Sequence, residues 1–475
     1  MIRKYNHIIL LCIFSLSLGS CEDYLDLQPE DKYTEDQVFS NELAIQEVLN
    51  GLYNKLASNS LYGANLSTTT VELLAQRYHT ARIGSVTAYS SLQGYNYNSN
   101  MVQPIFDDIW VSAYATISET NKFISELDEA RQNSVISVEK ANLLKGEAVA
   151  IRALLHFDLL RLFGPVYQTD SDKEAIPYYT DTDTQTQPIL SAEMVVNKIA
   201  ADLEAAQELM ANDPVKGVGV VFSQDFYKGY RNQRLNFYAI KALRARVSLY
   251  AGNTMLAHSL AKETLDEGEN QFPWLDFSNI VSGTDNPDRI FSTEVLFGVY
   301  NSNMYTNYTN FFSPELLENS LLAPHPERLE QVFENNENDY RYTTTWLNSI
   351  KGFRLFYKFA DIVDQTKPWR FVQPLIRKSE MYYILAETET DPDAALSYLN
   401  TVRNNRGLGD LPSGSDLNSE IRKEYQKEFW GEGQLFFYYK RKNIFDVPEA
   451  TNGYPWWTIA PSYVVPLPLS ETTPR

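Results

Sequence analysis

Paired helical segments are the feature that most limits how this chain can fold. Residues 138–163 carry one apolar stripe at three- and four-residue spacing, which Gly164-Pro165 end. Residues 236–268 show the same period in two halves separated by Gly252-Asn253, and residues 375–408 repeat that layout. Small residues recur where two paired helices must approach closely, as they do in tetratricopeptide (TPR) hairpins. The sequence therefore predicts a mainly α fold, built as a TPR-like helix-hairpin scaffold with few short strands.

Other segments surround these pairs. Further helices are expected at 34–56, where Ser40 is the candidate N-cap, at 106–130 and at 191–210. Long irregular loops separate the helices, some rich in Tyr, Asn and Ser and others in Gly, Pro and Asp: 78–104, 213–234, 268–290 and 298–313. Because long loops in a compact domain usually carry function, we expect the binding residues in these stretches.

Charge and cysteine content narrow the class of protein. The 475 residues carry a net charge of −20, which repels polyanions and argues against nucleic acid as a partner. The chain has two cysteines, Cys12 and Cys21, so its body contains neither a disulfide framework nor a thiolate zinc site. We expect no metal site and no cofactor.

The first 21 residues have the layout of a secretory leader. Arg3 and Lys4 precede an apolar run at 8–18, which is too short to span a bilayer, since a helix needs about 20 residues for that. The following Gly19-Ser20-Cys21 resembles the lipobox of a bacterial lipoprotein, in which the cysteine is lipidated and becomes the new N-terminus. Residues 1–20 are then the signal peptide and Cys21 is the anchor. The alternative is a plain signal peptide with a chance cysteine.

Four blocks in order resemble the SusD/RagB family of outer-membrane lipoproteins of the Bacteroidota. They are "GEAVAIRALLHFDLLRLFG" (146–164), "RNNRGL" (403–408), "IRKEYQKEFWGEGQL" (421–435) and "VPLPLSE" (465–471). The third block departs from the family pattern, since Leu435 stands for an arginine and Tyr438 for an aspartate. On this resemblance, residues 21–475 form one SusD-like domain, with an N-terminal part at 21–215 and a C-terminal part at 216–475.

The resemblance also implies a function and a location. Members are nutrient-binding proteins on the cell surface that lid a SusC-like TonB-dependent barrel in the outer membrane. The expected ligand is an oligosaccharide or polysaccharide. A peptide or glycopeptide ligand with the same partner is the first alternative, and a TPR scaffold that binds no small ligand is the second. Membrane attachment would come from the lipid on Cys21.

An enzyme is not indicated by the motifs. The chain has no HExxH, no G-x-S-x-G elbow and no P-loop, so no catalytic residues are assigned. Glu147 and Glu387 lie in helical blocks, where a solvated or ion-paired role is the default. His156 lies on the long helix, where a packed or surface role is expected rather than a catalytic one. Non-enzymatic binding is the better interpretation.

A neutral glycan is recognised by flat aromatic rings beside amides and a few charged groups. Among the 31 tyrosines, those outside helical periods are the candidates. The predicted ligand-binding residues are Tyr95, Asn96, Tyr97, Tyr300, Asn301, Tyr305 and Tyr308, followed by Arg82 and Trp346. For each tyrosine the alternative is a ring packed under its loop or at the transporter interface. Trp110 and Trp274 are expected in the core, and Trp456-Trp457 either on the scaffold or against the partner.

Overall fold

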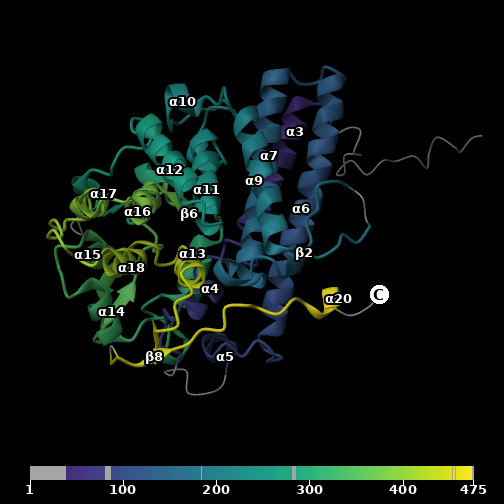
Figure 1. Cartoon of the computed structure of the whole chain (residues 1–475). Coiled ribbons are helices and arrows are strands. Elements are labelled where there is room, and N and C mark those ends of the chain that lie inside the picture. Colours follow the sequence, from purple (N-terminus) through teal and green to yellow (C-terminus); the bar gives the residue numbers. More distant parts are fainter. Residues whose placement is uncertain are drawn as a thin grey trace, which may run out of the picture.

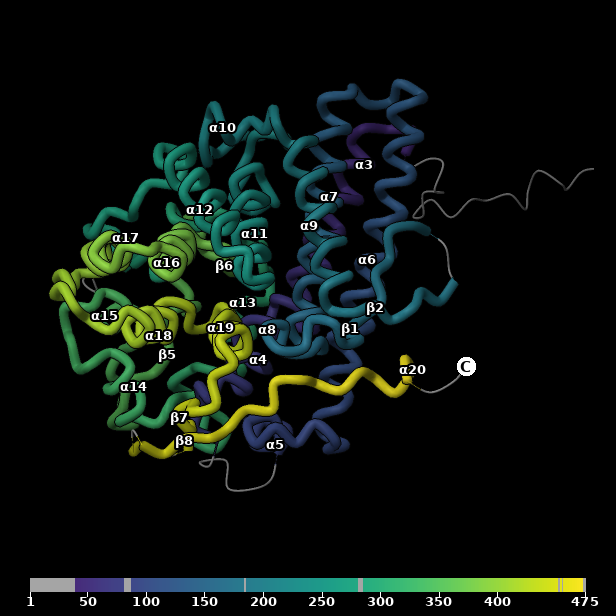
Figure 2. Tube along the Cα trace, viewed as in Figure 1, coloured from purple at the N-terminus to yellow at the C-terminus, as the bar shows by residue number. Residues whose placement is uncertain are grey.

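A row of paired helices forms the frame of the molecule (Figures 1 and 2). The structure, a computed structural model, describes residues 39–80, 87–182, 185–280, 285–451, 453–454 and 456–472. In the row, α3 packs on α6, α7 on α6 and α9, α11 on α9 and α12, and α16 on α12 and α17. The bounds are α3 Glu42–Leu56, α6 Gln103–Gln132, α7 Val138–Phe163, α9 Ala192–Leu209, α11 Phe237–Tyr250, α12 Thr254–Gly268, α16 Lys378–Thr388 and α17 Pro392–Asn404. The predicted mainly α, TPR-like frame is confirmed.

Side-chain caps explain where several of these helices begin. Ser137 accepts a hydrogen bond from the backbone N–H of Lys140 at the start of α7. Asn236 caps α11 in the same way. The cap of α3 is Asn41, whose Oδ1 accepts from the N–H of Leu43 at 2.8 Å, so the expected Ser40 cap was off by one residue.

Helix α7 forms the centre of the row. Nearly its whole surface is buried. Its apolar residues therefore lie on all sides of the helix, beyond the single stripe at three- and four-residue spacing. Gly146 permits the closest contact: a Cβ at this position would lie 2.6 Å from Cγ of Met210, the residue after α9. A small residue is therefore needed where α7 meets the end of α9.

Shorter elements complete the fold. Its short helices are α4 Thr70–Leu74, α5 Ala88–Gln93, α8 Tyr167–Asp170, α10 Val215–Val218, α13 Met304–Phe311, α14 Pro326–Phe333, α15 Tyr340–Thr345, α18 Leu417–Glu428, α19 Leu435–Arg441 and α20 Leu469–Thr472. The 3-10 turns are η2 Arg231–Gln233, η3 Phe277–Asn279, η4 Ser292–Glu294 and η5 Glu318–Ser320. After β8 the C-terminal segment runs across the molecule to α20, as the yellow trace in Figure 2 shows.

The strands form antiparallel two-stranded ribbons rather than a large sheet. The pairs are β1 Glu174–Ile176 with β2 Leu190–Ser191, β3 Val295–Tyr300 with β6 Val372–Arg377, β4 Trp346–Asn348 with β5 Arg354–Phe356, and β7 Val447–Pro448 with β8 Thr458–Ile459. In the part of the chain that the structure describes, no helix combines the length and the apolar character that crossing a membrane requires.

The stretch at 298–313 differs from the expected loop. It contains the end of β3 and the whole of α13. Tertiary contacts stabilise this helix in spite of its poor helix formers, because Nδ2 of Asn307 donates to the carbonyl of Gly63 at 2.9 Å and to Oδ1 of Asn59 at 2.8 Å. The expected loop at 78–104 likewise includes the short α5.

Candidate functional site

Two of the predicted tyrosines meet around a ring that the sequence did not single out. Tyr300 at the end of β3 and Tyr305 in α13 flank Phe371, with ring centroids at 5.1 and 4.9 Å. The Arg370 guanidinium lies 4.7 Å from the centroids of both Tyr305 and Phe371. Two nitrogens of this guanidinium group, Nε and Nη2, donate hydrogen bonds to the carboxylate of Asp361 at 2.7 Å each. This small cluster is partly exposed, mainly through Tyr300.

The neighbouring predicted residues are more deeply placed. Asn301 is buried, with Nδ2 donating to the carbonyl of Gly63 at 3.3 Å, so it holds the loop rather than facing solvent. The half-buried Tyr308 has its ring 6.1 Å from that of Tyr357. Trp346 is fully buried against Trp430, with centroids at 4.7 Å. Trp346 is therefore a core residue and not part of an exposed site.

The second tyrosine segment is held by its own hydroxyl groups. Tyr95 donates to the carbonyl of Leu74 at 2.9 Å, and the buried Tyr97 donates to the carbonyl of Ser462 at 2.6 Å. Asn96 between them is exposed. No hydrogen bond or ring contact among the described residues joins this segment to residues 300–308. Contacts among the described residues therefore do not bring the two tyrosine segments together into one site. Arg82 and Cys21 lie outside the described residues.

Among the described residues, the most exposed group of large aromatic rings lies elsewhere, at the tip of the β7–β8 hairpin. Between these two strands Tyr454, Trp456 and Trp457 are 56%, 72% and 55% exposed. The rings of Tyr454 and Trp456 are stacked, with centroids 5.0 Å apart and planes inclined by 23°. We call these three residues the aromatic tip.

Side chains of α14 donate hydrogen bonds to the backbone of the aromatic tip segment. Nη2 of Arg328 in α14 donates to the carbonyls of Glu449 and Tyr454 at 3.1 Å each. Nε2 of Gln331, one turn further on, donates to the carbonyl of Gly453 at 2.6 Å. Because α14 holds the main chain, the rings are positioned before any ligand arrives, which lowers the entropy lost on binding.

Polar groups border the aromatic tip. His325, the residue before α14, lies beside Gly453, and its ring is 5.0 Å from that of His79. The exposed Glu327 lies close to Gly453 on the same side as His325. Stacked rings next to imidazole and carboxylate groups suit a ligand that has apolar faces and a rim of hydroxyls.

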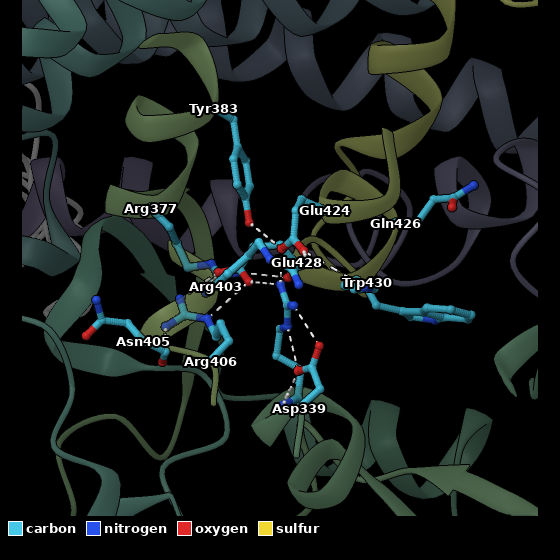
Figure 3. Close-up of polar contacts among 12 residues, drawn as sticks. Asp339, Arg377, Tyr383, Arg403, Asn405, Arg406, Glu424, Gln426, Glu428 and Trp430 are labelled. Carbon is cyan, nitrogen blue, oxygen red and sulfur yellow. Dashed lines mark hydrogen bonds and ion pairs between the residues drawn. The ribbon is translucent and has the colours of Figure 1, made fainter. Parts of the chain in front are cut away.

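The sequence blocks that carry the family resemblance have a different role, in a buried network of charges (Figure 3). Glu428 binds Arg341, Arg377 and Arg406 at nitrogen–oxygen distances of 2.8, 2.8 and 2.7 Å. The other members are Glu294, Asp339, Glu424 and Glu432 among the acids, and Lys358 and Arg403 among the bases. All these groups are buried or nearly so and fully engaged with one another. The network ties α16–α17 to α18, and its residues are scaffold.

The acidic and histidine candidates for catalysis are likewise engaged in the scaffold. Glu147 binds Arg231 at 2.5 Å, and Glu387 binds Arg441 at 2.6 Å, so of the two expected roles, solvated or ion-paired, both glutamates have the ion-paired one. His156 is buried against the ring of Tyr178, and burial lowers its pKa to about 3, so it is neutral at physiological pH. Among the described residues no cluster of His, Cys, Asp and Glu has the geometry to hold a metal ion.

Sequence reasoning missed the aromatic tip as a site, although a signal was present. The run "YPWW" at 454–457 combines three aromatic residues with a proline between two short extended segments. Such an aromatic run outside any helical period is a signal for exposed rings. Trp110 is in the core as expected, and the partly buried Trp274 packs against that core.

Comparison with known proteins adds the family. A family profile described as starch-binding and associating with the outer membrane matches residues 23–225, and the SusD family profile matches residues 219–455. Two SusD-like proteins of Formosa agariphila are 24% and 22% identical to this chain, over 93% and 84% of its length and 92% and 81% of their own.

Solved structures share the fold. A SusD superfamily protein of Bacteroides thetaiotaomicron superposes with a TM-score of 0.69 at 20% identity, covering 86% of this chain and 90% of its own. A SusD-like carbohydrate binding protein of Bacteroides vulgatus gives 0.68 at 18% identity, with 91% and 96% covered. A laminarin binding SusD-like protein gives 0.63 at 18% identity, with 91% and 97% covered. Two family profiles that together extend over residues 23–455, and relatives that align along most of the chain, establish that this protein belongs to the SusD/RagB family.

Proposed function

We propose that this protein is a cell-surface lipoprotein of the outer membrane that binds an oligosaccharide or polysaccharide and delivers it to a SusC-like TonB-dependent transporter. The aromatic tip is the proposed glycan platform. The observation that carries the proposal is the exposed, stacked pair of Tyr454 and Trp456 on a hairpin whose backbone is fixed by α14. Stacked rings offer a flat apolar surface to the C–H face of a sugar.

The family supports the ligand class and the location. One family profile carries the description starch-binding and associating with the outer membrane. Among the structural neighbours, one is titled a carbohydrate binding protein and another a laminarin binding protein. The anchor is assigned to Cys21 on its lipobox-like context, and the transporter partner on the family resemblance.

The proposal is tested by affinity electrophoresis of the purified protein through gels that contain soluble starch or laminarin. We expect retardation by at least one neutral polysaccharide. Replacing Trp456 or Tyr454 by alanine removes a stacked ring worth about 1 kcal/mol and should weaken binding about fivefold. Phe277→Ala is the matched control, because Phe277 is a half-exposed ring on η3, outside the hairpin.

The outcomes separate the parts of the proposal. Retardation that Trp456→Ala and Tyr454→Ala leave unchanged would remove the aromatic tip as the platform. Absence of binding to a wide panel of neutral glycans, together with binding to a peptide digest, would favour the peptide alternative.

A further inference from the structure

A cavity lies on the side of the molecule away from the aromatic tip. It has a volume of about 460 Å³, within the usual range for small-ligand sites. Its walls come from the segment after α10, from η2, from the end of α12 and from the residues before β6. Figure 1 shows α10 at the top of the molecule and β8 at the bottom, so the two places are well separated.

The lining of this cavity is aromatic and amide-rich, and none of the described residues that line it is charged. Phe222, Tyr230 and Trp369 supply rings, and Phe222 is 75% exposed at the mouth. The amides are Asn232, Gln233, Asn270 and Gln271. In a chain of net charge −20, an uncharged lining of this kind fits a neutral ligand better than an ionic one.

Three of the lining residues have polar atoms without a hydrogen bond to any residue that the structure describes. Oδ1 of Asn232, Oε1 of Gln271 and Nε1 of Trp369 are buried and make no such hydrogen bond. Gln271 is held in place by its other amide atom, because Nε2 donates to the carbonyl of Lys216 at 3.0 Å. Buried polar groups are normally paired, so two free acceptors and one free donor around one cavity require an explanation.

The cavity wall is built firmly. Arg231, next to Asn232 in η2, is buried in ion pairs with Asp213 at 2.9 Å and with Glu147 at 2.5 Å. Tyr230 has a φ of 41°, which is uncommon for a residue with a side chain, and its N–H donates to the carbonyl of Val221 at 2.8 Å. Strained backbone of this kind is concentrated at binding sites, where the surrounding structure holds it.

We infer that this cavity is a second saccharide-binding site, which takes a short neutral oligosaccharide or a segment of a longer glycan. A sugar hydroxyl both donates and accepts, so neighbouring hydroxyls can satisfy the amide oxygens of Asn232 and Gln271 and the indole N–H of Trp369 together. The sugar's C–H face fits the rings of Tyr230 and Phe222. This inference deepens the proposed function and rests on it. A polysaccharide held at both places would gain avidity.

Fluorine NMR can observe both sites in one sample. The full chain is labelled with 5-fluorotryptophan, and its seven tryptophan signals are assigned by single Trp→Phe variants. Maltotriose and laminaritriose are then titrated as probes. We expect a saturable shift of the Trp369 signal, while Trp456 and Trp457 report on the aromatic tip.

Asn232→Ala is the decisive variant. The Asn232 side chain makes no hydrogen bond to the described residues, so its removal breaks none of them. We expect it to weaken the binding seen at Trp369 about fivefold, the effect of one hydrogen bond. Asn310→Ala removes an exposed amide from α13 as the matched control and should change nothing. Trp369→Phe, followed by calorimetry, should also weaken binding, because phenylalanine lacks the indole N–H and offers a smaller ring.

The outcomes distinguish this inference from the function on which it rests. A Trp369 signal that stays still while Trp456 and Trp457 shift would overturn the second site and leave the function standing. A Trp369 shift that Asn232→Ala leaves unaltered would also overturn it. If no tryptophan signal responds to any glycan, starch and laminarin included, the proposed function and the second site fail together.

Discussion

At the scale of single residues, the carboxylate of Glu428 is a buried charge on which the fold depends. Burial alone would raise its pKa, yet Arg377, Arg406 and Arg341 surround it and lower the pKa well below its usual range. The charged form is therefore the one that the fold requires. The three guanidinium groups in turn depend on this carboxylate for part of their compensation.

Glu428→Gln should accordingly be strongly destabilising. The amide keeps the size of the side chain but leaves three buried guanidinium groups short of one negative charge. Breaking a buried ion pair in this way costs about 3–5 kcal/mol of unfolding free energy. Urea unfolding at neutral pH, followed by circular dichroism, measures the loss. Glu330→Gln, on the exposed face of α14, is the control, and an equal effect of both changes would contradict the role of the network.

Residues in helices were easier to interpret from sequence than residues in loops. A non-catalytic role for Glu147 and Glu387, solvated or ion-paired, followed from their helical positions, and the structure shows that both are ion-paired. Tyr97 and Trp346 lie outside helical periods, and their burial is decided by distant partners, Ser462 and Trp430 respectively. No local pattern contains that information.

At the scale of elements, the contact between α14 and α18 carries a pH-sensitive link. Glu334, at the end of α14, binds Lys427 at 2.7 Å and Lys423 at 3.0 Å, both from α18. Burial by itself raises the pKa of Glu334, but the hydrogen bonds and charges of the two lysines lower it from 4.5 to about 2. Because α14 also holds the aromatic tip, this link supports the proposed platform.

Glu334→Gln should lower stability only where the carboxylate is charged. A pKa that is depressed in the folded state adds stability above about pH 4.5, and this stability is lost as the pH falls from 4.5 towards 2. The side chain is 45% exposed, so screening limits the effect to about 1 kcal/mol. Thermal melting of both proteins between neutral pH and pH 3 checks this. A difference that stays constant over that range would contradict the assignment, and Glu318→Gln is the exposed control.

Element boundaries followed from sequence where capping and helix breakers were strong. Gly164-Pro165 ends α7, and Asp391 begins α17, as their chemistry requires. Helix α13 was missed because its tyrosines, asparagines and threonines are poor helix formers. Its stability comes from Met304 and Asn307, which are buried against other parts of the chain.

At the scale of the whole molecule, the family resemblance gave the helical row and the scaffold, but not the binding surface. The sequence blocks that carry the resemblance are largely core and ion network, as the positions of Arg406 and Glu428 show. A glycan surface needs no fixed motif, since rings from any loop serve equally well. The aromatic tip and the cavity that Trp369 lines depend on segments that come from different parts of the sequence. Only the folded structure shows that these segments lie next to each other.

The proposed lipid anchor on Cys21 would determine where the proposed binding surface is displayed. A thioether-linked diacylglycerol and an acylated N-terminus would bury several acyl chains, each methylene adding about 0.8 kcal/mol of membrane affinity, and more than one chain is needed for stable anchoring. Cys21→Ala should therefore abolish incorporation of radiolabelled palmitate and remove the protein from the outer-membrane fraction. Cys12→Ala is the matched control, because it changes the other cysteine of the chain within the apolar run of the leader and should leave both readouts unaltered. Persistent labelling of the Cys21→Ala protein would show that the anchor lies elsewhere, and the glycan platform would then have to reach the cell surface by another route.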